Sequence, residues 1–269
     1  MTVVDADVST SERPTTARSR PSIAIVMPAF NEADRIRATF EAIASYVART
    51  GHRLPLFLAD DGSTDRTTGV AWATAERLGL DLEILRMPHR GKALTVRDAM
   101  LAVSGRIGTD YLLMLDADNE IAIDQLDHVV WSDEPRTVYI ARRVAEAHGA
   151  LGATPTPIRR LMSIGMRLAA RSLLGLPFTD TQCGFKLFPR GLAFELFSQQ
   201  RSNGWVFDAE ILVIARASGL PIREVPVVWQ PRGQSRVRAS AAATSAVGLL
   251  VIAVRRWAGR YRRVGRPAR

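Results

Sequence analysis

The chain has 269 residues, of which 47% are hydrophobic, and this content is enough to bury one sizeable core. It contains a single cysteine, Cys183, which excludes an internal disulfide and is compatible with a reducing compartment. The net charge is +9, and the four histidines are too scattered along the chain to predict a zinc site.

The first 21 residues are rich in Ser, Thr, Arg and Asp and contain no apolar stretch. A secretory signal peptide needs an apolar run of about 7–15 residues, so none is expected here. We expect the segment 1–21 to be disordered and the ordered chain to begin near residue 22.

Short apolar runs alternate with helical patterns from residue 22 to about residue 141. The apolar runs predict strands at 23–27, 54–59, 82–86, 111–115 and 137–141, and the patterns between them predict helices at about 31–49, 64–79, 91–104 and 122–131. Such alternation with short loops is typical of a parallel sheet covered by helices on both faces. Ligands of these sheets bind at the carboxyl ends of the strands, where the motifs described next are found.

The first predicted strand is followed by Pro28-Ala29-Phe30-Asn31-Glu32, so the glycine-rich dinucleotide fingerprint is absent there. Gly91-Lys92 resembles the end of a phosphate-binding P-loop. However, Arg86 stands in place of the leading glycine, and Ala93 stands in place of the required Ser or Thr. These differences disfavour a dehydrogenase and a P-loop NTPase.

The second predicted strand ends in Asp60-Asp61-Gly62-Ser63-Thr64-Asp65. Gly62 permits a tight turn, and Ser63 or Thr64 can cap the helix that follows, so a strand–turn–helix junction explains part of this segment. It does not explain two adjacent acids at the end of an apolar strand. A carboxylate at that place can accept hydrogen bonds from a nucleobase or a ribose.

The strand predicted at 111–115 ends in Asp116-Ala117-Asp118. Carboxylates at positions i and i+2 can bind one divalent cation, and oxygen ligands suit Mg²⁺ or Mn²⁺. Such ions are commonly held by one or two carboxylates together with substrate phosphates. Two aspartates after a strand are also common as solvated turn residues, and for this pair taken alone that alternative stays open.

Residues 143–174 contain two segments of different character. Residues 143–157 hold glycines and prolines without a regular pattern, which suggests either a mobile loop over the site at the strand ends or a passive linker. Residues 158–174 form a basic amphipathic pattern in which arginines alternate with Leu, Ile and Met. Helices of this kind often lie at membrane surfaces, and packing on the core with an arginine-rich outer face is the alternative.

The C-terminal region, residues 239–269, combines an uncharged stretch with a basic tail. Residues 239–254 are too short and too polar to span a membrane, and residues 255–269 hold seven arginines and no acid. We expect a helix that lies on a bilayer, with Trp257 and Tyr261 as anchors, or that packs on the domain. The tail could attract nucleic acid or an anionic membrane surface, but the absence of a known motif disfavours nucleic acid.

Four motifs together, at 28–32, 60–65, 90–93 and 116–118, resemble in order and spacing the inverting family 2 glycosyltransferases of the GT-A fold. The segments 180–188 (DTQCGFKLF), 205–210 and 233–237 are similar to those of dolichyl-phosphate β-glucosyltransferases, with the mannosyltransferases more distant. The likeness covers roughly residues 22–260. It implies an α/β fold with a mostly parallel central sheet flanked by helices, and a catalytic domain over 22–238. The C-terminal amphipathic helix and basic tail over 239–269 are predicted from the pattern described above, not from this likeness.

The resemblance also implies roles for individual residues. The nucleotide sugar would be bound by Pro28, Phe30, Glu32, Asp60, Lys92, Asp116, Ala117 and Asp118. Mg²⁺ or Mn²⁺ would be held by Asp116, Asp118 and Glu120, and donor or acceptor phosphates would meet Arg142, Lys186, Arg232 and Arg236. Asp118 and Asp180 would be catalytic, with Asp180 as a base or an orienting carboxylate. Capping the turn before a strand is the alternative for Asp180, and a surface charge is the alternative for Lys186.

The predicted reaction is the metal-dependent, inverting transfer of a hexose from a nucleotide sugar to a polyprenyl or dolichyl phosphate. UDP-glucose is favoured as the donor, and GDP-mannose stays open. Many relatives carry transmembrane helices after the catalytic domain, and none is evident in this sequence. We therefore expect a cytoplasmic enzyme that is peripheral at the cytoplasmic face of the membrane, needs a membrane partner, or uses a soluble acceptor such as a natural product.

Overall fold

The computed structural model describes residues 20–144, 165, 168–230 and 240–265. Nearly all of the segment 1–21 lies outside these residues, as do the predicted loop from residue 145 onward and the start of the predicted helix 158–174. Arg232 and Arg236 also lie outside the described residues, so the roles predicted for them stay predictions.

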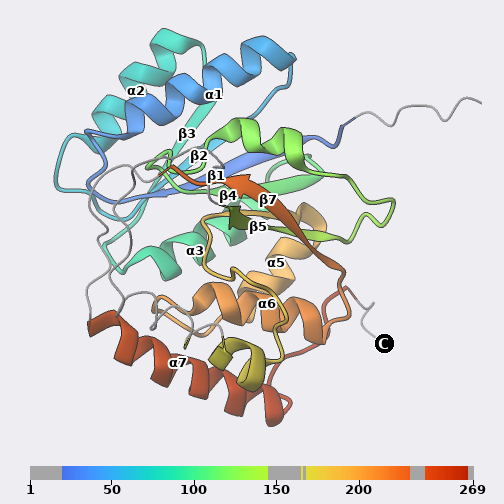
Figure 1. Ribbon diagram of the computed structural model, residues 1–269. Helices are drawn as coiled ribbons and strands as arrows, with labels where there is room; N and C mark the ends of the chain where they lie inside the picture. The colour runs from blue at the N-terminus through green and yellow to red at the C-terminus, as the bar shows by residue number, and fades with distance from the viewer. Residues whose placement is uncertain (1–19, 145–164, 166–167, 231–239, 266–269) are drawn as a thin grey trace, which may run out of the picture.

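Seven strands form one central sheet in the order β3-β2-β1-β4-β6-β5-β7 (Figure 1). The strands are β1 (Ile23–Ala29), β2 (Leu56–Asp60), β3 (Leu82–Arg86), β4 (Tyr111–Leu115), β5 (Val138–Val144), β6 (Phe185–Pro189) and β7 (Ile222–Val228). The pairs among β1 to β4 are parallel, and β5 pairs in parallel with β7. The five predicted strands are all present, and the predicted mostly parallel sheet is confirmed.

The exception is β6, which pairs antiparallel with both β4 and β5. Neither β6 nor β7 is among the strands predicted above. Because β6 runs opposite to β4, its first residue, Phe185, lies opposite Leu115, the last residue of β4. The loop that precedes β6 therefore reaches the carboxyl end of β4, where Asp116 follows.

Helices cover both faces of the sheet (Figure 1). One apolar cluster lies between the sheet and α1 (Ile36–Thr50), α2 (Thr67–Leu78) and the 3₁₀ helix η1 (Ile123–His128). A second cluster lies between the other face and α3 (Lys92–Ser104), α5 (Arg190–Ser198) and α6 (Phe207–Ala217). The predicted helix 31–49 begins only at Ile36, and the predicted helix 122–131 is a 3₁₀ helix of six residues.

The C-terminal helix α7 (Ser240–Trp257) forms an outer layer against α6 (Figure 1). Leu249, Ile252 and Ala253 of α7 belong to the same apolar cluster as α6, so one side of this helix is part of the core. Packing on the domain, one of the two alternatives predicted for this helix, is thus confirmed for that side. Within the part of the chain that the structure describes, no helix is both long and apolar enough to cross a membrane.

Candidate active site

A small cavity of about 60 Å³ lies at the carboxyl end of β4. Its lining includes all three residues of the predicted metal set, Asp116, Asp118 and Glu120, together with side chains from β5 and from the loops before β6 and after β7. Ala117 lies between the two aspartates, is buried, and its carbonyl accepts a hydrogen bond from the hydroxyl of Thr39 at 2.7 Å. The segment after β4 is therefore anchored to α1.

Lys92, the first residue of α3, is paired with Asp116. Its Nζ donates to Oδ2 at 2.7 Å and lies 2.6 Å from Oδ1. Burial alone would lower the pKa of Lys92, but the nearby carboxylates of Asp116, Asp208 and Asp118 together outweigh burial and raise it, so the ammonium stays charged. Oδ1 of Asp116 is buried and accepts no hydrogen bond in suitable geometry from the described residues. This oxygen could ligate a cation, and the ammonium could meet a donor phosphate.

Asp118 lies beside Glu120, whose backbone N–H donates to Oδ1 of Asp118 at 3.1 Å. Burial, followed by the negative charge of Asp116, raises the pKa of Asp118. Glu120 accepts a hydrogen bond from the indole N–H of Trp229 at 2.9 Å. Among the described residues, no three His, Cys, Asp or Glu side chains are gathered closely enough to hold a metal ion. The predicted set of three carboxylates is therefore not gathered as a metal site, and this corrects the role predicted for Glu120. Asp116 and Asp118 would fit a divalent cation as a pair, with substrate phosphates as further ligands.

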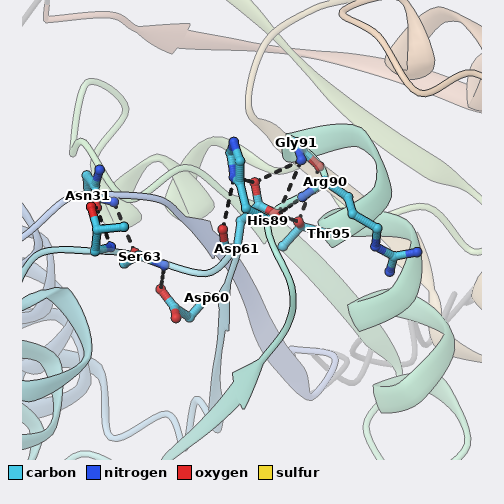
Figure 2. Close-up of polar contacts among 9 residues, drawn as sticks. Asn31, Asp60, Asp61, Ser63, His89, Arg90, Gly91 and Thr95 are labelled. Atoms are coloured by element: carbon cyan, nitrogen blue, oxygen red, sulfur yellow. Dashed lines mark hydrogen bonds and ion pairs between the residues drawn. The ribbon is translucent and has the colours of Figure 1, made fainter.

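Asp61 is a structural residue, which corrects the suggestion that two adjacent acids at this strand end imply a ligand site. Its buried carboxylate accepts hydrogen bonds from the N–H groups of Arg90 (2.9 Å) and Gly91 (3.0 Å) and from the Thr95 hydroxyl (2.7 Å), as Figure 2 shows. These bonds fix the loop that leads into α3. Asp60 is the acid for which nucleoside binding is predicted, and that role stays a prediction.

Asn31 connects the loop after β1 to the loop after β2 (Figure 2). Its side-chain oxygen accepts hydrogen bonds from the N–H groups of Thr64 (2.9 Å) and Asp65 (3.3 Å), and its own N–H donates to the Ser63 hydroxyl at 3.0 Å. The N–H of Ser63 in turn donates to Oδ1 of Asp60 at 3.3 Å. The two loops are thereby held as one unit around Asp60.

The other residues predicted to surround the nucleobase and ribose have different environments. The Phe30 ring stacks on the His89 ring with a centroid distance of 4.1 Å, and the His89 side chain is 57% exposed. Pro28 is buried inside β1, so it could affect a nucleotide only through the strand. The Glu32 carboxylate forms an ion pair with Arg35 at 2.6 Å. Phe30 and His89 thus form an aromatic edge beside the two joined loops.

Asp180 is held by Arg143, a β5 residue that lines the cavity. The guanidinium donates two hydrogen bonds to the carboxylate, at 2.6 Å and 3.1 Å. Burial would raise the pKa of Asp180, but the hydrogen bonds and charge of Arg143 outweigh it and hold that pKa below its usual range. Such a carboxylate suits an orienting role better than that of a base near neutral pH. The sequence predicts a phosphate contact for Arg142, but the arginine that lines the cavity is its neighbour Arg143.

Lys186 is neither a surface charge nor a cavity residue, which corrects both alternatives predicted for it. Its side chain is 1% exposed, and Nζ donates to Oδ1 of Asp208 at 2.7 Å and to the carbonyl of Cys183 at 2.5 Å. It lies in β6, opposite Met114 of β4. The Lys186–Asp208 pair therefore supports the loop before β6, because Nζ of Lys186 also holds the Cys183 carbonyl in that loop.

Residues 24–197 match the family described as glycosyl transferase family 2. The chain belongs to this family. Among its relatives, a dolichyl-phosphate beta-glucosyltransferase of Trichomonas vaginalis is 31% identical over 85% of this chain and 70% of its own length. The dolichyl-phosphate beta-glucosyltransferase of Saccharomyces cerevisiae is 29% identical over 77% of this chain and 66% of its own length. The family predicted from the four motifs is therefore confirmed, and the protein is a glycosyltransferase.

Solved structures share the fold of this family 2 glycosyltransferase. Glucosyl-3-phosphoglycerate synthase of Mycobacterium tuberculosis superposes with a TM-score of 0.60 at 18% identity, over 88% of this chain and 81% of that one. A structure of the same synthase with Mn²⁺, UDP-glucose and phosphoglyceric acid has a TM-score of 0.61 at 19% identity, over 87% of this chain and 80% of that one. These likenesses confirm the predicted GT-A fold.

Besides Arg143, two contributors to the glycosyltransferase site were not predicted from the sequence. Gly184 lies against the Asp116 carboxylate, and Trp229 bonds to Glu120 from the end of β7. Gly184 could have been recognised from the sequence, because a glycine directly before an apolar run can mark a close approach of two backbones. Trp229 gave no signal of its own, because its place depends on the unpredicted strand β7.

Proposed function

We propose that this glycosyltransferase moves glucose from UDP-glucose to a polyprenyl or dolichyl phosphate with inversion, with GDP-mannose as the competing donor. The observation that carries the proposal is the pairing of Asp180 with Arg143, which lines the same cavity as Asp116 and Asp118. An acceptor hydroxyl needs a base at this place, whereas an acceptor phosphate needs a cation. The names of the relatives at about 30% identity support the same acceptor.

The reaction breaks the bond between the anomeric carbon of the sugar and the β-phosphate oxygen of the donor, and it forms a bond from an acceptor phosphate oxygen to that carbon. The second pKa of a phosphate monoester is about 6, so the acceptor is already largely a nucleophilic anion at neutral pH. No proton then has to be removed by the protein. Catalysis rests on positioning and on stabilising the charge of the departing nucleoside diphosphate.

The residues at the carboxyl ends of the strands divide these tasks. Asp60 and the Phe30 edge would meet the nucleoside, and the Lys92 ammonium would stabilise the departing diphosphate. Arg143, oriented by Asp180, would bind the acceptor phosphate. Asp116 and Asp118 would hold Mg²⁺ or Mn²⁺, which when bound supplies Lewis-acid stabilisation of the diphosphate charge. The protein would act as a peripheral enzyme at the cytoplasmic face of a membrane, with residues 22–238 as its catalytic domain.

Incubation with labelled UDP-glucose or GDP-mannose, each with and without polyprenyl phosphate, tests this function. We expect label to enter the lipid fraction only with UDP-glucose, polyprenyl phosphate and a divalent cation together. If only GDP-mannose labels the lipid, the sugar in the proposal is mannose and the proposed acceptor is unchanged. Transfer to a water-soluble hydroxyl compound, with none to the lipid phosphate, would overturn the proposal.

A further inference from the structure

The outer face of α7 is a continuous apolar stripe. It consists of side chains that are 41–67% exposed: Val247, Leu250, Val251, Val254 and Trp257. Their spacing of three and four residues places them along one side of the helix, over a length of about 15 Å. Large apolar patches on a protein surface usually mark a contact with a partner or a membrane.

The inner face of α7 packs on the domain, so the apolar stripe faces away from the domain. Leu249, Ile252 and Ala253 are buried in the core cluster. Gly248 packs so closely that a Cβ there would lie 2.5 Å from a methyl carbon of Val206. The helix is therefore apolar on both sides, although only one side is covered. In a soluble setting the outer side of such a helix is expected to be polar.

The charges around the stripe favour one kind of partner. No acidic residue occurs between residues 240 and 265, and the chain leaves α7 through the exposed arginines Arg260, Arg262 and Arg263. The two arginines inside α7 are only partly exposed: Arg255 faces buried Glu210 at 3.4 Å, and the Arg256 guanidinium lies near Gly175. A second copy of this face would offer these arginines no negative charge, because residues 240–265 contain no acid. An anionic lipid surface offers apolar chains to the stripe and negative headgroups to the arginines.

We propose that α7 lies in the surface of an anionic bilayer, with the stripe in the acyl boundary and Trp257 at the headgroup level. A helix in this position inserts about 5–10 Å, which matches side chains on one face. This inference rests on the proposed function, because binding of α7 to a bilayer would bring the enzyme to a lipid acceptor that resides there. Figure 1 shows α7 as the outermost layer of the molecule, on the side of the sheet away from α1 and α2.

Vesicle flotation of the full chain tests the proposal without any reaction. We expect binding to vesicles that contain phosphatidylglycerol, weaker binding to phosphatidylcholine alone, and loss of binding with added salt, because salt screens surface charge beyond about 10 Å at 0.1 M. The triple variant Leu250→Ser/Val254→Ser/Trp257→Ser should bind anionic vesicles at least tenfold more weakly. Trp72→Ser is the matched control, because Trp72 is 58% exposed on α2, and it should bind like the parent protein.

Two further measurements make the outcomes distinct. Circular dichroism and the oligomeric state of the triple variant should equal those of the parent. Transfer to a short, water-soluble prenyl phosphate without vesicles should be unchanged in the triple variant. Failure of this transfer in the parent protein would count against the proposed function, not the docking surface. Equal flotation of variant and parent, or a parent dimer that the triple substitution dissociates, would overturn the membrane surface.

Discussion

The carboxylate of Asp116 occupies the space in which a side chain at position 184 would lie. A Cβ on Gly184 would be 2.0 Å from Oδ2 and 2.2 Å from Cγ of Asp116, far inside van der Waals contact. The N–H of Asp116 also donates to the carbonyl of Gly184 at 3.1 Å, so the two backbones are held together. The absence of a side chain at 184 is what lets the first aspartate of the pair lie beside the start of β6.

Gly184→Ala should therefore displace the Asp116 carboxylate and reduce transfer by about 10²-fold, the effect expected of a catalytic group moved by about 1 Å. Steady-state kinetics measure the loss, and urea unfolding separates it from a loss of fold. Gly191→Ala is the control, because no atom lies within 4 Å of the corresponding Cβ. Equal activity of the two variants would show that the contact is not needed.

Removal of the second carboxylate tests the metal assignment. Asp118→Ala should reduce transfer by about 10³-fold or more, because the loss of metal-ion stabilisation costs several kcal/mol in the transition state. EDTA should abolish activity of the parent enzyme, and Mg²⁺ or Mn²⁺ should restore it. Asp124→Ala, which removes an exposed carboxylate from η1, serves as the control. Full turnover in chelator would refute the assignment.

Asp180→Asn distinguishes an orienting carboxylate from a base. If Asp180 only positions Arg143, the variant should raise the KM for the acceptor phosphate and keep kcat within about tenfold. A general base would instead contribute about 10²–10⁴-fold to kcat, and its removal would erase the acidic limb of the pH–rate profile. Kinetics across pH with polyprenyl phosphate measure both quantities. A kcat loss of that size would return Asp180 to the role of base.

Lys186 should contribute to stability and not to acceptor binding. Lys186→Met leaves the Asp208 carboxylate buried without its partner, and such a change costs about 3–5 kcal/mol of unfolding free energy. The double variant Lys186→Met/Asp208→Leu should recover most of this loss, because neither charge is then left buried alone. Urea unfolding measures both values. A raised acceptor KM with unchanged stability would instead identify a phosphate contact.

Acid should weaken the contact between Asp127 of η1 and Arg20. Asp127 accepts hydrogen bonds from Arg20 (2.7 Å), Arg49 (2.8 Å) and Tyr46 (3.1 Å). These bonds, with that from Arg20 as the largest contribution, lower the pKa of Asp127 to about 2. The unfolded carboxyl titrates near 3.9, so the folded state gains stability above that pH and loses it as pH falls through about 2.

Asp127→Asn should thus lower the unfolding free energy at pH 7 by about 1–2 kcal/mol, less than the full pKa shift implies, because the side chain is partly exposed. The difference between variant and parent should shrink as the pH falls from about 4 to about 2. Urea unfolding across this range measures it, with Asp34→Asn as the control. A difference that does not change with pH would show that ionisation of Asp127 is not its source.

Local sequence patterns predicted the five parallel strands because each is a short apolar run followed by polar residues. They did not predict β6, in which a lysine interrupts the apolar run and finds its partner, Asp208, in a helix much later in the chain. They did not predict β7 either, where Pro226 and exposed charges indicate a loop but are tolerated at the edge of the sheet. Pairing between distant segments decides both cases.

The same limit explains which site residues were assigned correctly. Asp116 and Asp118 follow a strand whose end could be predicted, so their place in the cavity could also be predicted. Arg143, Gly184 and Trp229 reach that cavity through the register of β5, β6 and β7. Successive side chains of a strand point to opposite faces, so an error of one position assigns the wrong residue to the cavity, as with Arg142 and Arg143.

The bridge that Asn31 forms has a consequence for how tightly the enzyme can hold a donor. Its backbone adopts a left-handed φ of 54°, and its amide joins the two loops through hydrogen bonds within the protein itself. Ordering of these loops therefore occurs during folding, and little conformational entropy is left to lose when the nucleoside binds. Donor affinity would then depend mainly on the contacts themselves. Loosening the loops at Asn31 would weaken donor binding even if every contacting residue were unchanged.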